Sequence, residues 1–369
     1  MTSAPLTSVV LAAGEGTRMR STRPKPLHLL CGRAMLLHIL DAVAEVAVSR
    51  AVVVVGHGAE RVTKKLTEQG PPDLVIDFVE QVVQRGTGDA LMAGLTAFPD
   101  EPDDEEGGGD VLVVPGDTPL LLPTTLAALV AAHRAAGAAA TLLTARVPDP
   151  TGYGRVVRGR DDKVVRVVEQ ADATPEEREI DEINTSIYCF RRSVLAPALR
   201  RLSPQNALGE YYLTDVVEVL SEAGYPVRAF EAEDARTCMG VNDRVQLAAA
   251  EAELRRRTNE RWLRLGVTML DPERTYLDTT VRLAPDVTLF PGVILQGATV
   301  VGERAEVGPD ARLVDCTVGA DAVVSSTVGV DAEVGAGARV GPFAVLEPGS
   351  SIAPGGVTGP FYTSTDRRD

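Results

Sequence analysis

Aliphatic residues recur at every sixth position near the end of this 369-residue chain. They are Leu283, Leu289, Leu295, Val301, Val307 and Leu313 and, after the spacing slips between residues 316 and 327, Val328, Val334, Val340, Leu346 and Ile352. Small or β-branched residues follow four positions later, at Val287, Val293, Thr299, Ala305, Ala311 and Thr317, then at Ala332, Ala338, Ala344, Ser350 and Gly356. This period fits neither an α-helix nor a single strand, and it predicts a parallel β-helix with three short faces per coil and one inward aliphatic side chain per face. About four such coils fit between residues 283 and 356.

The front of the chain has a different pattern, in which buried-strand runs alternate with helical segments. The strand-like runs cover residues 8–14, 51–58, 73–80 and 110–117, and the helical segments cover 34–48, 59–68, 89–97 and 123–136. Such alternation predicts a mostly parallel sheet covered on both faces, with ligands bound beyond the carboxyl ends of its strands. Shorter strands between residues 152 and 190 predict a mixed region of the sheet, and residues 243–265 predict a long helix.

Composition excludes several classes of function. A formal net charge of −15 argues against long-range attraction to nucleic acid or to an anionic membrane. The four cysteines contain no CxxC pair, which predicts reduced thiols and not a metal site. No apolar run reaches the roughly 20 residues that span a bilayer, and no signal-peptide pattern is present, so we expect a cytoplasmic protein. The acidic stretch over residues 100–110 is typical of a solvated loop.

A glycine-rich loop follows the first strand-like run, with the sequence LAAGEGTRMRSTRPKPL over residues 11–27. Gly14 and Gly16 permit a tight turn and a close approach to a ligand, and the nearby arginines and lysine supply positive charge. The loop matches neither the Walker A pattern nor GxGxxG, because Met19 stands where the third glycine belongs. Taken alone, the loop has two open interpretations: a phosphate-binding loop, or a turn with ordinary surface charge.

Further segments narrow this choice. The loop is similar to the LAAGxGTRMxxxxPKxL signature of sugar-1-phosphate nucleotidylyltransferases, and downstream follow QVVQRGTGDA (81–90), PGDTPLL (115–121), PTGYGRVVR (150–158), VVEQADAT (167–174), EINTSIY (182–188), GEYYLTDVV (209–217) and GVNDRVQLAAAE (240–251). Together they resemble the bifunctional N-acetylglucosamine-1-phosphate uridylyltransferase/glucosamine-1-phosphate acetyltransferase family, GlmU. The resemblance implies a Rossmann-like α/β nucleotidyltransferase domain (residues 1–242), a linker helix (243–266), a left-handed parallel β-helix (267–360) and a tail (361–369). It also implies a homotrimer.

The resemblance assigns roles to individual residues. It implies that Arg18 and Lys25 stabilise charge on a triphosphate and on the transition state, and that Asp117 and Asn242 bind Mg²⁺. It implies backbone contacts to the uridine nucleotide from Leu11, Ala12, Ala13 and Gly14, and uracil recognition by Gln81, Gln84, Gly86 and Thr87. It implies further that Gly116 and Asn242 lie at the nucleotide sugar and that Gly154, Glu169 and Asn184 hold the N-acetylglucosamine moiety. Each residue also has an ordinary structural interpretation, such as a turn, a cap or a solvent-facing side chain.

The implied reaction is uridylyl transfer from UTP to N-acetylglucosamine-1-phosphate. A metal, cations and positioning suffice for such chemistry, and no covalent nucleophile is needed. Two alternatives stay open. One is a related nucleotidylyltransferase that uses another hexose-1-phosphate or dTTP, and the other is a catalytically silent paralogue that serves in assembly.

The sequence departs from the family pattern in its last part. Glu347 stands in place of the arginine of the LRPG motif and Thr365 in place of the lysine of the FVExK segment, and no residue supplies the acetyltransferase histidine. We therefore expect no acetyl transfer to glucosamine-1-phosphate. Pro115 replaces an aromatic residue and Ser186 replaces a glycine beside expected substrate contacts.

Overall fold

The computed structural model describes residues 5–46, 48, 50–98 and 109–364. The chain forms two compact units, the first comprising Met1–His28 and Ala34–Gln246 and the second comprising Leu29–Arg33 and Leu247–Asp369. The second unit therefore includes a short segment that the sequence places inside the first domain. The predicted acidic loop lies outside the described residues except for its last two positions, and Thr365 also lies outside them.

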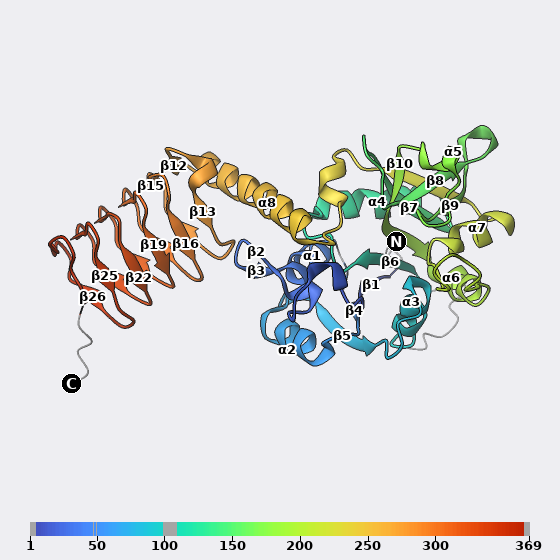
Figure 1. Cartoon of the computed structure of the whole chain (residues 1–369), viewed down its shortest axis with the longest axis horizontal. Helices are drawn as coiled ribbons and strands as arrows, with labels where there is room; N and C mark the ends of the chain where they lie inside the picture. The colour runs from blue at the N-terminus through green and yellow to red at the C-terminus, as the bar shows by residue number, and fades with distance from the viewer. Residues whose placement is uncertain (1–4, 47, 49, 99–108, 365–369) are drawn as a thin grey trace. The chain divides into compact units, whose positions relative to one another are not determined.

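A nine-stranded sheet forms the centre of the first unit (Figure 1). Its strands are β1 (Leu6–Ala12), β4 (Arg50–Val55), β5 (Val75–Glu80), β6 (Asp110–Pro115), β7 (Ala140–Arg146), β8 (Gly154–Arg158), β9 (Val164–Val168), β10 (Glu182–Arg191) and β11 (Val227–Glu231). The main path runs β11-β7-β10-β6-β1-β4-β5. Strands β6, β1, β4 and β5 pair in parallel, whereas β10 is antiparallel to β6, β7 and β8. The predicted mostly parallel sheet with a mixed region is confirmed.

Helices cover both faces of this sheet because successive strand residues point to opposite sides. The helices are α1 (Met35–Ala44), α2 (Ala59–Gln69), α3 (Thr87–Leu95), α4 (Pro123–Ala135), α5 (Pro175–Arg178), α6 (Arg192–Leu199) and α7 (Asp215–Glu222). On β1, Val10 packs in one core with α1 and α4, and its neighbour Val9 packs in a second core with α3, α6 and α7. Among the described residues, no helix has both the length and the apolar content needed to cross a bilayer.

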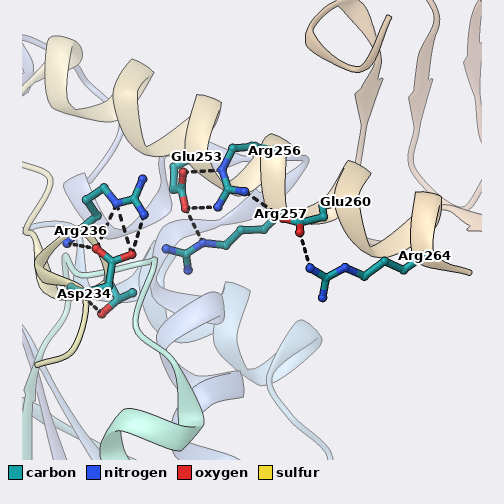
Figure 2. A network of polar contacts seen from close by, with 8 residues as sticks. Asp234, Arg236, Glu253, Arg256, Arg257, Glu260 and Arg264 are labelled. Atoms are coloured by element: carbon teal, nitrogen blue, oxygen red, sulfur yellow. Dashed lines mark hydrogen bonds and ion pairs between the residues drawn. The ribbon is translucent and has the colours of Figure 1, made fainter. Parts of the chain in front are cut away.

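Helix α8 (Arg244–Arg264) carries a row of ion pairs that runs from the largely buried Glu253 to the exposed Arg264 (Figure 2). Glu253 accepts hydrogen bonds from Arg256 (3.0 Å) and Arg257 (2.8 Å), Arg256 also contacts Glu260 (2.9 Å), and Glu260 accepts from Arg264 (2.5 Å). The hydrogen bonds from Arg256, with those from Arg257, lower the pKa of Glu253 to about 2. Figure 2 also shows Asp234, which caps the 3₁₀ turn η4 (Ala235–Cys238) of the first unit by accepting from the Arg236 N–H at 3.0 Å.

The second unit is a parallel β-helix built from three five-stranded sheets (Figure 1). The first sheet contains β12 (Thr268–Met269), β15 (Thr288–Leu289), β18 (Glu306–Val307), β21 (Val323–Val324) and β24 (Arg339–Val340). The second contains β13 (Tyr276–Leu277), β16 (Ile294–Gln296), β19 (Arg312–Val314), β22 (Val328–Val330) and β25 (Val345–Leu346). The third contains β14 (Arg282–Leu283), β17 (Val300–Val301), β20 (Thr317–Val318), β23 (Glu333–Val334) and β26 (Ser351–Ile352). The described strands thus form one coil more than expected, because the coil of β12–β14 is interrupted by the 3₁₀ turn η5 (Pro272–Arg274) and its hexad spacing is hidden.

One of the predicted inward positions is wrong, and it lies where the spacing slips. Val328 is 46% exposed, and Gly329 occupies the inward position between Leu313 and Leu346. Nearby, Thr317 is exposed, and Cys316 points inward. The cause is that three corners are one residue shorter than the others. Each shortened corner contains one residue with positive φ, namely Asp315 (53°), Ser326 (42°) and Asp331 (45°), a conformation in which Asp is several-fold enriched.

The segment at residues 29–33 joins the second unit through backbone hydrogen bonds. It forms the turn between two short strands, β2 (Leu29–Leu30) and β3 (Arg33–Ala34). The Cys31 N–H donates to the Glu251 carboxylate at 2.7 Å, and the Cys31 carbonyl accepts from the Thr279 N–H at 2.9 Å. Burial, together with the negative charge of Glu251, raises the pKa of the Cys31 thiol. This cysteine is therefore a structural, protonated thiol.

Candidate active site

A cavity of about 480 Å³ opens in the first unit beyond the carboxyl ends of β1, β5 and β6. All residues that the resemblance assigned to the site line it: Leu11, Ala12, Ala13, Gly14, Arg18, Lys25, Gln81, Gln84, Gly86, Thr87, Gly116, Asp117, Gly154, Glu169, Asn184 and Asn242. This is the edge where parallel sheets bind ligands. The structure therefore brings the predicted residues together, and their individual roles stay predictions.

The glycine-rich loop forms one wall of this cavity. Gly14 has open space where a Cβ would stand, so its backbone is accessible to a ligand. Gly16 has a φ of 65°, and a Cβ there would lie 2.6 Å from the Cβ of Lys25. Two 3₁₀ turns follow, η1 (Thr17–Met19) and η2 (Lys25–Leu27). The loop therefore packs against the stem of Lys25 and holds that side chain at the cavity.

Four polar side chains meet at the centre of the cavity. Lys25 Nζ donates to Asp117 Oδ2 at 2.5 Å and to Asn242 Oδ1 at 2.9 Å. Arg18 Nη2 donates to the same Asn242 oxygen at 3.0 Å. The Lys25 and Asp117 side chains are only 13% and 26% exposed, so their charges are screened less by solvent than a surface pair would be. Two cations and two oxygen ligands from distant parts of the sequence thus converge at one place.

The residues at this centre fit a magnesium ion. Asp117 Oδ2 and Asn242 Oδ1 both contact a single positive group, the Lys25 ammonium, which shows that the two oxygens face a common point. A carboxylate and an amide oxygen suit Mg²⁺, which usually completes its coordination with water and substrate phosphate oxygens. In the part of the chain that the structure describes, no group of three or more His, Cys, Asp or Glu side chains is placed to hold a metal.

The loop between β5 and α3 forms a second wall. Gln84 Nε2 donates to the Ala13 carbonyl at 2.7 Å, which joins this wall to the glycine-rich loop. Thr87 Oγ1 accepts from the Leu213 N–H at 3.0 Å. Gln81 is 6% exposed, and its Nε2 donates to Asp89 Oδ2 at 2.7 Å and to the Gly86 carbonyl at 3.2 Å. These side chains are fixed by the protein before any ligand binds.

The opposite wall contains groups suited to a neutral polar ligand. Asn184 is 3% exposed, its Nδ2 donates to the Tyr188 hydroxyl at 2.7 Å, and its Oδ1 is buried without a hydrogen-bond partner. Glu169 Oε1 accepts from the Thr214 hydroxyl at 2.9 Å, and burial raises the pKa of this carboxyl. An unpaired buried acceptor is costly to the free protein, so a ligand N–H or O–H at Asn184 would gain from satisfying it.

Local backbone geometry explains one glycine at the cavity, Gly116, and bears on one position, Ser186, where the family has glycine. A Cβ on Gly116 would lie 2.8 Å from the Ala12 Cβ and 2.9 Å from the Leu11 carbonyl oxygen, so close packing of β6 on β1 requires this glycine. Ser186, which stands where the family has glycine, lies beside a register shift in β10 and has a φ of 61°. It therefore adopts a conformation that glycine adopts more readily.

Several residues that line the cavity were not predicted from the sequence. They include Tyr153, Leu208, Glu210, Tyr212, Thr214 and Gly240. Tyr153 and Thr214 belong to the recognised segments PTGYGRVVR and GEYYLTDVV. Their position inside recognised segments could have indicated these residues, but the sequence does not show which side chains of a segment face the cavity.

Comparisons with known proteins agree with this geometry. A family model described as the MobA-like NTP transferase domain matches residues 8–222. Proteins named "Bifunctional protein GlmU" are similar over most of the chain. The one from Mycolicibacterium vanbaalenii is 48% identical over 312 residues, which is 84% of this chain and 62% of the relative. The one from Thermobifida fusca is 49% identical over 317 residues (86% and 64%), and the one from Shouchella clausii is 41% identical over 312 residues (85% and 66%). The chain thus spans a little under two thirds of the length of these relatives.

Proposed function

Because this chain belongs to the family of MobA-like NTP transferase domains, we propose that it transfers a uridylyl group from UTP to N-acetylglucosamine-1-phosphate. The products are UDP-N-acetylglucosamine and pyrophosphate. The observation that carries the proposal is the convergence of Lys25, Arg18, Asp117 and Asn242 in one cavity. The similarity to GlmU proteins supports the choice of nucleotide and sugar.

In the proposed reaction, a phosphate oxygen of the sugar phosphate attacks the α-phosphorus of UTP. A new P–O bond forms, the bond from the α-phosphorus to the bridging oxygen breaks, and pyrophosphate leaves. The attacking oxygen is already anionic, so no general base has to remove a proton. The reactants repel each other electrostatically, and Lys25 and Arg18 offset this repulsion by placing two positive charges on the cavity wall. Catalysis of this kind rests on positioning and charge stabilisation.

Asp117 and Asn242 are the residues that would hold Mg²⁺. When bound, this ion supplies positive charge that neutralises phosphate oxygens and orients them. In the structure, Lys25 Nζ contacts both oxygens. We therefore propose that Lys25 exchanges these partners for substrate phosphate oxygens during the reaction.

Pyrophosphate release tests this proposal directly. Wild-type protein is assayed with UTP, N-acetylglucosamine-1-phosphate and Mg²⁺, beside Lys25→Ala and Asp117→Ala. We expect each variant to lose about 100-fold or more in kcat/KM, because each removes charge at the reacting phosphates. Lys64→Ala, the same substitution on the exposed side of α2, is the matched control and should retain wild-type activity. Chelation of Mg²⁺ should abolish release. Wild-type activity no higher than that of Lys25→Ala would overturn the proposal.

A substrate panel separates the alternatives. The unpaired acceptor of Asn184 would accept a hydrogen bond from the N–H of an acetamido sugar or from a hexose hydroxyl, so the preference for an acetamido sugar is supported by the similarity to GlmU proteins. We expect N-acetylglucosamine-1-phosphate to react faster than glucose-1-phosphate, and UTP faster than dTTP. A reversed order would identify a related nucleotidylyltransferase. No release with any pair would indicate the silent assembly paralogue.

Two further proposals concern the β-helix. We propose that this chain does not transfer acetyl groups to glucosamine-1-phosphate, because the exposed Glu347 places a negative charge where the family has arginine. Acetyl transfer from acetyl-CoA by the pure protein would contradict this. We also propose that the β-helix forms a homotrimer, since flat sheet faces favour self-association. Light scattering measures this directly, and a monomeric mass would reject it.

A further inference from the structure

We propose that Asp89 determines the choice of pyrimidine base by fixing the orientation of the Gln81 side-chain amide. Gln81 lines the cavity, whereas Asp89 does not. Asp89 would therefore be a positioning residue that acts through Gln81. This inference rests on the proposed use of UTP and on the uracil contact that the family resemblance implies for Gln81, and it adds Asp89 as the residue that orients this contact.

The Gln81 amide nitrogen has two hydrogen-bond acceptors beside it. Nε2 lies 2.7 Å from Asp89 Oδ2 and 3.2 Å from the Gly86 carbonyl oxygen. An ionised carboxylate and a backbone carbonyl can only accept hydrogen bonds. An amide carbonyl in the place of Nε2 would face two acceptors without a proton between them. The chemistry of the two neighbours thus fixes which end of the amide faces them.

The other end of the Gln81 amide, its carbonyl oxygen Oε1, stays free for a ligand. Nε2 has two protons, and the two acceptors use both of them. Gln81 is 6% exposed and lines the cavity. Within the described residues Gln81 Oε1 receives no hydrogen bond, and this oxygen is not fully buried. It is therefore accessible from the cavity. Gln81 therefore offers a ligand an acceptor and no donor.

This acceptor can be matched to a base. The Watson–Crick edge of uracil has one donor, N3–H, between two carbonyl acceptors. An acceptor-only Gln81 can therefore pair with uracil only at N3–H. A cytosine held in the same position would place its unprotonated N3 against Gln81 Oε1 without a proton between them, and its one donor, the N4 amino group, could reach Oε1 only if the base shifted along its edge. A buried polar group left unpaired in this way discriminates strongly, so the fixed amide favours UTP over CTP.

Asp89 is well placed to hold this orientation. It lies in the first turn of α3 (Thr87–Leu95), on the same loop-to-helix segment that begins at Gln81. A carboxylate in the first turn of a helix is favoured by the helix dipole. Replacement by Asn keeps the shape but adds a donor, so the Gln81 amide would be free to turn its nitrogen toward the base.

The test measures the affinity of the full-length protein for UTP and for CTP by calorimetry, for wild type, Asp89→Asn and the matched control Asp73→Asn, in which the exposed Asp73 undergoes the same change. We expect wild type and Asp73→Asn to prefer UTP. We expect the ratio of UTP to CTP affinity to fall about tenfold or more in Asp89→Asn, with part of the change arising from tighter CTP binding. Thermal melting shows whether the isosteric variant is folded.

The outcomes separate the two proposals. If wild type does not prefer UTP, the proposed uridylyl transfer is wrong. If wild type prefers UTP and folded Asp89→Asn retains the same ratio, Asp89 does not set the choice of base. A purely structural role for Asp89 would weaken both nucleotides by the same factor and leave the ratio unchanged, which would also overturn the inference.

Discussion

The two units of this chain build their interiors by opposite rules. In the β-helix, each strand pairs with the strand one coil later, as Leu289 does with Val307, and the same kind of inward residue recurs at every step. In the cavity of the first unit, the partners of Lys25 lie 92 and 217 positions away in the sequence. Arg18 and its partner Asn242 are 224 positions apart. Repetition gives the second unit its structure, whereas the site depends on contacts that occur only once. Chemistry in this protein is thus concentrated where the sequence pattern is least periodic.

The largest change in the free energy of unfolding is expected from substitutions among the inward residues of the β-helix. Val324 is fully buried and Val328, four positions later, is 46% exposed. Val324→Ala should lower the free energy of unfolding by about 2–3 kcal/mol, since it removes buried methyl groups and leaves a cavity. Val328→Ala should change it by about 0.5 kcal/mol or less. Urea unfolding measures both values.

This pair of substitutions tests the register as well as the packing. If Val328 were inward, as the hexad spacing alone predicts, the two costs would be similar. Because neither residue lines the cavity, pyrophosphate release under folding conditions should stay within about twofold of wild type. A large loss of activity in Val324→Ala would show that the two interiors are coupled.

A smaller effect is expected from a carboxyl near the cavity. Burial, with the negative charges of Glu218, Glu169 and Asp172, raises the pKa of Asp215 to about 6. Between the ordinary pKa near 3.9 and this value, the folded state binds more protons than the unfolded state. The stability of wild type should therefore fall as the pH rises through about 6. Asp215→Asn should remove this contribution and raise the melting temperature by a few degrees at pH 7.5.

The control for this prediction is the pH dependence itself. At about pH 4.5, where Asp215 is protonated in the folded protein but largely ionised in the unfolded chain, the difference between wild type and Asp215→Asn should shrink to a minor part of its value at pH 7.5. Asp73→Asn, on an exposed turn, should leave the melting temperature unchanged at both pH values. A difference between wild type and Asp215→Asn that is equal at pH 4.5 and pH 7.5 would show that ionisation of Asp215 is not its cause.

The smallest effect is expected on helix α8, where charge pairs repeat along the surface. Glu260→Gln breaks contacts to Arg256 and Arg264, which are 55% and 78% exposed. Exposed pairs at this spacing contribute about 0.3–0.5 kcal/mol each and are screened by salt. We expect the urea midpoint to fall slightly at low salt and to match wild type in 1 M NaCl. A loss that persists in high salt would point to packing and not to charge.

The sequence predicted the β-helix well because each inward residue obeys one local rule. It failed at Val328, because three corners are one residue shorter than the others and no local pattern marks them: corners of ordinary length also contain a residue with positive φ, such as Asp286 or Asp321. The segment at residues 29–33 was also missed. Its place in the second unit depends on the hydrogen bond from Cys31 to Glu251, 220 positions away, which no local pattern encodes.

In the candidate site, too, the sequence predicted which segments are involved but not which side chains contact each other. The recognised segments named residues that line the cavity, because most of these segments end a strand or begin a helix, whereas the segments at 150–158 and 182–188 contain the starts of β8 and β10. They could not indicate that Lys25 contacts both Asp117 and Asn242, or that Gln81 donates a hydrogen bond to Asp89. Those facts depend on side-chain orientations, which follow from packing between distant segments.

The shortened corners of the β-helix show where this chain can change its length. Three corners omit a residue, yet the strands on either side keep their pairing, as Val318 does with Val334 and Val324 with Val340. The ladder hydrogen bonds set the alignment of each strand, so a corner can absorb a deletion without turning the next inward side chain outward. Single-residue deletions and insertions in the course of evolution should therefore accumulate at corners and be rare within strands. The β-helix can thus tolerate drift in length while it preserves its interior.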